Sequence, residues 1–265
     1  MTQSAPASAT ARHDWINACR FHDLRESEVL AEVARRVRST ERPLVLLDLD
    51  STLYEVEPRS HQILLEWCES AESRPFPHVR EKVAKITGEH LGYSIKDTFT
   101  ALGLSIELRE IEMAWESAKD FWLTRFFNSE YLKYDRAYPG AADFVHEVHK
   151  LGAEIVYLTG RDEPQMGDGT RQNLIRDGFP WEVKGTHLLM KPRFEMDDLI
   201  HKKGAADYIR KHGNLIASFE NEPLNLIGLY EIFPSAMHVF VETIFSDRPA
   251  LPREGLYRIK NFSRE

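Results

Sequence analysis

The sequence predicts an α/β protein in which a parallel sheet is interrupted by a block of helices. Three observations support this fold class. Short apolar runs alternate with helical periodicity from residue 138 onward, a buried-strand pattern at 44–47 ends in acidic residues, and 59–130 shows helical spacing without a convincing strand. Such alternation is typical of βαβ units and of a parallel sheet with helices on its faces.

The N-terminal region predicts a polar tail followed by a helix. Residues 1–12 include an Ala- and Ser-rich stretch without the apolar core of a secretory signal, so we expect a flexible tail. A helix is expected within 13–38, where Ser27 can act as a cap. One face of this helix carries the apolar side chains of Val29, Leu30, Val33 and Val37.

The first strand is expected directly after Pro43. Leu44 to Leu47 form a continuous apolar run, which is typical of a strand buried on both faces of a parallel sheet. The next block, 59–130, is predicted to be helical. Its clearest helical spacing is that of Leu108, Ile111, Trp115, Trp122 and Phe126. Aromatic residues in such a pattern most often form a packed helical face, with the lining of a substrate pocket as the alternative.

The remainder of the chain predicts alternating helices and strands. A turn at Tyr138-Pro139-Gly140 precedes a helix that ends at Gly152. Strands are expected at 154–158, 188–190, 215–219 and 237–241, with helices at 170–177 and 202–212 and another between the last two strands. The glycine-rich segment 167–170 lacks the lysine pattern of a phosphate-binding loop, and we interpret it as a turn with Thr170 capping the next helix.

Composition excludes several functional classes. The 265 residues carry 34 basic and 42 acidic side chains, a formal net charge of −8, which argues against a general nucleic-acid binder. No apolar run approaches the roughly 18 residues that a membrane span requires. Cys19 and Cys68 are too few for a disulfide framework or a zinc site. We therefore expect a soluble, cytoplasmic protein.

Polar side chains follow three of the predicted strands. Asp48 and Asp50 follow the first, Thr159, Gly160 and Arg161 the second, and Glu220, Asn221 and Glu222 the third. In open parallel sheets, ligands bind beyond the carboxyl ends of the strands. The sequence therefore predicts one rim rich in carboxylates. For Arg161 the sequence favours neither of two roles, a contact with the substrate or a structural ion pair.

Asp48 and Asp50 are two residues apart, so on an extended segment their side chains would point to the same side. Two close carboxylates repel each other unless a cation lies between them or one is protonated. A hard cation such as Mg²⁺ resolves this conflict, with Glu220 as a natural third ligand. The alternative is that one of the two aspartates only caps a turn.

These segments resemble the sequence motifs of the haloacid dehalogenase-like hydrolases. The strand and acidic residues at 44–53 look like the first motif, Asp-x-Asp-x-Thr; the segment 155–161 resembles the second, a strand that ends in Thr or Ser; and 216–221 is similar to the fourth, a strand that ends in acidic residues. The resemblance implies a Rossmann-like core, residues 13–58 and 131–265, with an inserted helical cap at 59–130.

The resemblance also implies a role for each rim residue. Asp48 would be the nucleophile and Asp50 the general acid and base. Thr159 and Gly160 would bind the phosphoryl group together with a lysine. The implied metal is Mg²⁺, with Asp48, Asp50, Glu220 and Asn221 as its ligands.

Three lysines are candidates for binding the phosphoryl group, and the fourth motif departs from the usual pattern of the family. Lys202 is the favoured phosphate-binding lysine because it lies beside the inward stripe of its helix, ahead of Lys203 and Lys191. The fourth motif more commonly carries two aspartates, whereas Glu220 and Asn221 stand here. The neutral Asn221 weakens the charge available to a metal.

The resulting functional prediction is Mg²⁺-dependent hydrolysis of a small phosphate monoester, with a phosphorylated metabolite as the partner. A phosphomutase, or a non-catalytic scaffold that docks through the helix at 13–38, remains as an alternative. A dehalogenase is disfavoured because Asp50 is present, and a nucleic-acid 3′-phosphatase because of the cap and the acidic charge. The sequence does not predict which ester is cleaved, nor the oligomeric state.

Overall fold

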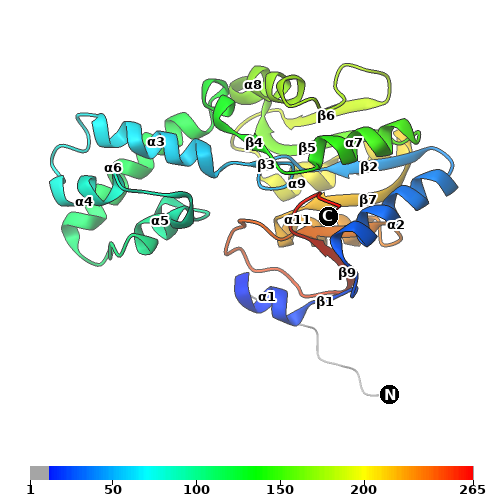
Figure 1. Ribbon diagram of the computed structural model, residues 1–265, viewed down its shortest axis with the longest axis horizontal. Helices are drawn as coiled ribbons and strands as arrows, with labels where there is room; N and C mark the ends of the chain where they lie inside the picture. The colour runs from blue at the N-terminus through cyan, green and yellow to red at the C-terminus, as the bar shows by residue number, and fades with distance from the viewer. Residues whose placement is uncertain (1–11, 265) are drawn as a thin grey trace.

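The core of the protein is a seven-stranded sheet in which every strand pairing is parallel (Figure 1). The computed structural model describes residues 12–264, and the strand order within them is β1-β9-β8-β7-β2-β5-β6. The strands are β1 (Arg20–Phe21), β2 (Pro43–Leu47), β5 (Glu154–Asp162), β6 (Thr186–Lys191), β7 (Asn214–Glu220), β8 (Met237–Val241) and β9 (Glu254–Ile259). The predicted Rossmann-like α/β class is confirmed.

Helices cover both faces of this sheet. They are α1 (Arg12–Ala18), α2 (Glu26–Ser39), α7 (Ala141–Lys150), α8 (Glu163–Arg176), α9 (Asp198–Gly204), α10 (Ala206–His212) and α11 (Pro223–Ile232). Within residues 12–264, no helix combines the length and the apolar character that crossing a bilayer requires.

Strand β2 lies at the centre of the sheet, and its two faces pack against different helical layers. Val45 and Leu47 belong to the larger core cluster, which includes residues of α2 and α7. Leu44 and Leu46 belong to a second cluster, which includes Ile209 of α10. All four strand side chains are fully buried, as the continuous apolar run predicts. The central position brings the carboxyl end of β2 to the middle of the rim.

A block of helices stands to one side of the sheet (Figure 1). It contains α3 (Glu57–Glu69), α4 (Pro77–Val83), η1 (Gly88–His90), α5 (Ile95–Ala101) and α6 (Arg109–Phe126), and we call residues 57–126 the helical segment. This segment has a hydrophobic core of its own, centred on Ile63, Trp67, Phe99, Ala114 and Ala118. It is flanked by a two-stranded antiparallel ribbon, β3 (Tyr54–Glu55) with β4 (Arg136–Ala137), and by η2 (Ser129–Tyr134).

The N-terminal region differs from the prediction of one helix over 13–38. The edge strand β1 separates α1 from α2, because its backbone pairs in parallel with β9. Helix α2 begins one residue before Ser27, with Arg25 as its N-cap and the Glu28 side chain accepting from the Arg25 backbone N–H. The predicted apolar face of α2 is confirmed as buried. The predicted tail 1–12 lies outside the described residues, apart from Arg12.

The prediction of a turn at 167–170 is wrong. These residues lie inside α8, which begins at Glu163 with Asp162 as its N-cap. The glycines serve close packing: a Cβ at Gly169 would lie 2.5 Å from the backbone oxygen of Ser129. Glycine therefore lets α8 approach η2, and Thr170 is a buried residue within the helix.

Candidate active site

Two predicted strand ends and one helix meet at a buried ammonium group. Lys202 of α9 donates hydrogen bonds to Asp48 Oδ1 at 2.7 Å and to Glu220 Oε2 at 2.5 Å. Asp48 directly follows β2, and Glu220 is the last residue of β7. Because these two strands are neighbours in register, their carboxyl ends bring both acids to the same lysine.

The other two candidate lysines point elsewhere. Lys203 pairs with Glu231 at 3.0 Å on the surface, and Lys191 pairs with Asp198 at 2.9 Å. Lys202, by contrast, is only 2% exposed. Of the three candidates, Lys202 is therefore the one that the tertiary structure brings to Asp48.

Burial governs the electrostatics of this trio. It raises the pKa of Asp48 above its usual range, although Lys202 opposes the shift. Burial and the neighbouring charge of Asp48 raise the pKa of Glu220 to about 8. Burial disfavours the ammonium form of Lys202, but the two acids outweigh this effect and raise its pKa. Lys202 therefore stays charged, and the two acids compete for one counter-charge.

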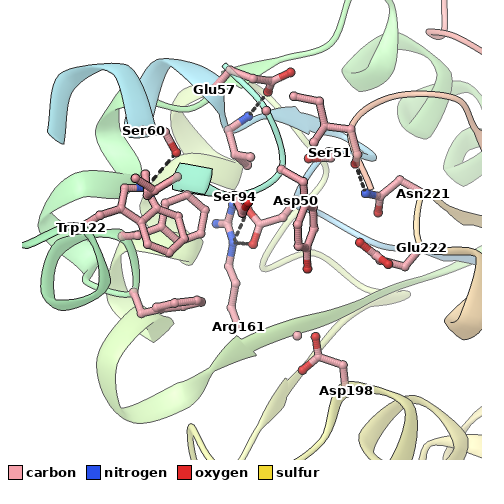
Figure 2. A pocket seen from close by; sticks show the side chains of 18 of the residues that line it. Asp50, Ser51, Glu57, Ser60, Ser94, Trp122, Arg161, Asp198, Asn221 and Glu222 are labelled. Atoms are coloured by element: carbon pink, nitrogen blue, oxygen red, sulfur yellow. Dashed lines mark hydrogen bonds and ion pairs between the residues drawn. The ribbon is translucent and has the colours of Figure 1, made fainter. Parts of the chain in front are cut away.

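The Asp50 carboxylate is held by two arginines. Its Oδ1 accepts from Arg161 Nη2 at 2.6 Å and from Arg59 Nη2 at 2.8 Å, and Figure 2 shows the contact with Arg161. Both guanidinium groups also donate to Asp135, at 2.7 Å from Arg59 Nε and 2.8 Å from Arg161 Nη2. Burial opposes ionisation of Asp50, yet the two arginines outweigh it and hold its pKa well below the usual range.

This network joins the core to the helical segment. Arg59 comes from α3, at the start of the helical segment, and its Nη1 donates to the backbone oxygen of Phe126 at 2.9 Å. Asp135 follows η2. The structural ion pair was one of the two open roles of Arg161 and is confirmed. Sequence reasoning missed Arg59 and Asp135, because no local pattern links residues so far apart.

We expect Asp135→Asn to lower the free energy of unfolding by about 3–5 kcal/mol, because it removes one anion from a buried network of two cations. Urea denaturation would measure the change. Asp207→Asn is the matched control, since the Asp207 side chain is 98% exposed in its pair with Arg210. A loss at Asp135 below about 1 kcal/mol, the range of surface pairs, would contradict the expected role.

Thr159 and Gly160, the predicted phosphate-binding residues, both lie within β5 but take different positions relative to the cavity. Gly160 lines the cavity described below, whereas Thr159 is fully buried and its Oγ1 accepts from the Arg161 backbone N–H at 3.2 Å. A Cβ on Gly160 would lie 2.6 Å from Asp198 Oδ2. Glycine at this position therefore lets α9 and the lysine that it carries approach the strand.

Thr52 connects two of the predicted metal ligands. Its Oγ1 lies 3.2 Å from both Asp48 Oδ2 and Asn221 Oδ1, and one hydroxyl proton can serve only one of them. A carboxylate oxygen and an amide oxygen thus lie near each other at the rim, a donor pair that suits Mg²⁺. Glu222 turns away from this point, to the backbone N–H and hydroxyl of Ser246.

The four predicted metal ligands do not surround a single point. Glu220 Oε2 is bound by Lys202, and the Asp50 carboxylate is bound by the arginines. In the part of the chain that the structure describes, no three His, Cys, Asp or Glu side chains are arranged to hold a metal ion. The oxygen pair of Asp48 and Asn221, with Glu220 adjacent, is the part of the set that fits Mg²⁺.

A cavity of about 550 Å³ lies between this rim and the helical segment. The rim contributes Asp48, Asp50, Lys202, Glu220 and Asn221. The opposite wall contains Trp115, Trp122, Phe126 and Phe127. All four side chains are half-buried, and Trp115, Trp122 and Phe126 also pack against the core of the helical segment. Their role is therefore broader than the predicted packed helical face, since they line the cavity as well; Figure 2 shows Trp122 on the cavity wall.

The sequence profile of the haloacid dehalogenase-like hydrolases matches residues 43–188, more than half of the chain. The protein belongs to this family. The match begins at the first residue of β2 and includes Asp48 and Asp50, all of the helical segment and β5. It ends before Lys202 and Glu220, which the motifs predicted, and the structure shows that Lys202 contacts both Asp48 and Glu220. No protein with a curated description matches the sequence.

Three solved structures are similar to this chain over most of its length. A Clostridium difficile protein to which phosphatase activity is ascribed is 13% identical with a TM-score of 0.52, over 82% of this chain and 94% of its own. Protein tyrosine kinase A of Mycobacterium tuberculosis is 13% identical with a TM-score of 0.47, over 82% and 94%. A Bacteroides fragilis protein described as a haloacid dehalogenase-like hydrolase is 12% identical with a TM-score of 0.42, over 80% and 95%.

Proposed function

We propose that this haloacid dehalogenase-like hydrolase is a Mg²⁺-dependent phosphatase that cleaves a small phosphate monoester through an aspartyl-phosphate. The observation that carries the proposal is the buried Lys202 ammonium between Asp48 and Glu220 at the floor of a cavity. This arrangement supplies a carboxylate nucleophile and a cation for phosphoryl oxygens within one hydrogen bond of each other.

In the first step, an Asp48 carboxylate oxygen bonds to phosphorus while the bond from phosphorus to the ester oxygen breaks. The leaving alkoxide takes a proton from Asp50. In the second step, Asp50 removes a proton from water, the resulting hydroxide attacks phosphorus, and the bond to Asp48 breaks. Inorganic phosphate is released and Asp50 regains its proton.

Asp50 must carry a proton to act as the acid, yet Arg59 and Arg161 hold its pKa low. A bound phosphoryl group places negative charge beside Asp50 and attracts the guanidinium groups of Arg59 and Arg161. Both effects raise the pKa of the Asp50 carboxyl group. Asp50 is the residue of the network with solvent access, since its side chain is 32% exposed while both arginine side chains are fully buried. The network therefore orients Asp50, and the bound substrate allows it to hold the proton that it later donates.

Asp48, Asn221 and Glu220 are the residues that would hold Mg²⁺. Bound there, the ion would neutralise phosphoryl charge and allow an anionic substrate to approach Asp48. Lys202 provides part of the same neutralisation from the protein itself. A small phosphorylated metabolite is the proposed partner, because the cavity between the rim and the helical segment has the size of a small-ligand site.

A phosphate-release screen over phosphorylated metabolites, with and without Mg²⁺, tests the proposal. We expect release only with Mg²⁺ and only from some esters. Absence of release from every ester in millimolar Mg²⁺ would instead support a non-catalytic scaffold. Transfer of phosphate between sugar phosphates without net release would support a phosphomutase.

A further inference from the structure

Aromatic side chains of the helical segment and Phe127 line the cavity. The Phe126 ring lies between Trp122 and the Arg59 guanidinium, whose carbon is 4.1 Å from the ring centroid. Trp122 stacks on Phe126 with ring centroids 4.2 Å apart, and Phe127 meets the Phe126 ring edge-on at 5.1 Å. Trp122 Nε1 donates to Ser60 Oγ at 3.0 Å, so the indole ring is held in place. Aromatic walls of this kind bind planar rings by stacked or edge-on contact.

The same wall carries cations without acidic partners. Lys96 and Lys119 line the cavity, and no ion pair is formed by either among residues 12–264. Lys119 Nζ lies 4.7 Å from the centroid of the Trp115 ring. Of the remaining cavity carboxylates, Asp198 pairs with Lys191, Glu222 binds Ser246, and Glu57 accepts from the Val56 backbone N–H. The helical side of the cavity therefore has positive charge available for an anion.

Two buried polar atoms on cavity-lining residues lack a hydrogen-bond partner within the described part of the chain. They are Trp115 Nε1 and Asn225 Oδ1. Such atoms are normally paired in native structures, and an unpaired one costs about 1–3 kcal/mol. Each atom is covered by protein, so a bound molecule would reach it only after the neighbouring side chains move.

We propose that the substrate is an aromatic phosphate monoester that carries a carboxylate at the end of the ring remote from the phosphate. This proposal rests on the proposed phosphatase function and names the substrate class of the same site. The phosphate meets Asp48 and Lys202, the ring meets the aromatic wall, and the carboxylate meets Lys96 and Lys119. The volume of about 550 Å³ lies within the range of small-ligand sites.

A sugar phosphate fits the wall less well. Recognition of its hydroxyl groups requires several free polar partners. Ser60 Oγ and Ser94 Oγ each already accept one hydrogen bond, from Trp122 Nε1 and from the Asp97 backbone N–H, so these two hydroxyl groups keep only part of their hydrogen-bonding capacity for a sugar. The helical wall is otherwise dominated by aromatic rings and ammonium groups, which favour a planar anion.

Binding to the Asp48→Asn protein tests this inference without turnover. The probes are 4-carboxyphenyl phosphate, phenyl phosphate and 4-carboxycyclohexyl phosphate, measured by isothermal titration calorimetry in Mg²⁺. We expect the first to bind at least about tenfold more tightly than either of the others, because it alone combines the ring with the carboxylate. Adding Lys96→Ala or Lys119→Ala should remove most of the preference over phenyl phosphate.

Lys85→Ala is the matched control, because Lys85 belongs to the helical segment but pairs with Glu81 on the surface. It should leave the preference unchanged. Equal binding of the three probes, or no binding of any, would overturn the inference. Hydrolysis of p-nitrophenyl phosphate by the unaltered protein is scored separately: hydrolysis with equal binding overturns only the substrate class, whereas the binding preference without any hydrolysis overturns only the phosphatase proposal.

Discussion

Replacing Asp48 with asparagine is expected to lower kcat roughly 10⁴-fold or more, the usual loss when a nucleophile that works with a base is removed. The amide oxygen can still accept from Lys202, so the side chain keeps its place, but the amide cannot form the phosphoryl-enzyme. Steady-state phosphate release on the best ester from the metabolite screen would measure the loss. Activity above about a hundredth of the unaltered protein would contradict covalent catalysis by Asp48.

The fold should survive this substitution. Asp48, Glu220 and Lys202 together carry two potential negative charges against one positive charge, and burial raises the pKa of both acids. Removing the charge of Asp48 leaves a balanced pair of Lys202 and Glu220 instead of an uncompensated buried ion. A thermal unfolding midpoint no lower than that of the unaltered protein is therefore expected, and a large decrease would assign Asp48 a structural role.

The second large effect is expected at Asp50. Asp50→Asn should reduce kcat roughly 10²- to 10⁴-fold on phenyl phosphate, the usual contribution of a general acid, and much less on p-nitrophenyl phosphate. The difference arises because the nitrophenolate leaving group needs little protonation in the transition state. Parallel measurement of kcat on the two esters gives the ratio directly. Equal losses on both would show that Asp50 acts only through the position of its neighbours.

Asp135→Asn is the matched control for this experiment. It disturbs the same pair of arginines, Arg59 and Arg161, but leaves the carboxylate of Asp50 in the cavity. Its side chain is fully buried, whereas that of Asp50 is 32% exposed. Asp135→Asn should therefore cost more stability than Asp50→Asn, while the ratio of kcat values on the two esters stays close to that of the unaltered protein.

Local patterns in the sequence were sufficient to predict most strands of the core sheet. Each predicted strand, at 44–47, 154–158, 188–190, 215–219 and 237–241, lies within an observed strand. For the four central strands the reason is that a parallel strand buried on both faces needs a continuous apolar run, whereas β6 is a half-buried edge strand. Strands β1 and β9 escaped prediction because β1 has only two residues and β9 carries charged residues and Gly255 instead of a continuous apolar run.

Local patterns failed where packing overrides them. The glycine-rich segment 167–170 has the composition of a turn, but it lies within α8 because Gly169 allows close contact with η2. Trp115, Trp122 and Phe126 have the spacing of a packed helical face, and periodicity alone does not distinguish a face that packs on a core from one that also lines a cavity.

By itself, the sequence determined the α/β class, the positions of five of the seven sheet strands along the chain, and the acidic residues at the strand ends. Only the tertiary structure decided that Lys202 donates a hydrogen bond to Asp48. It also decided that Arg59 and Arg161, themselves paired with Asp135, form ion pairs with Asp50. The physical reason is the distance along the chain over which each kind of signal acts. Apolar periodicity acts over one or two turns of chain, whereas a buried charge is balanced by whichever partner the folded backbone brings to it, here up to 154 residues away.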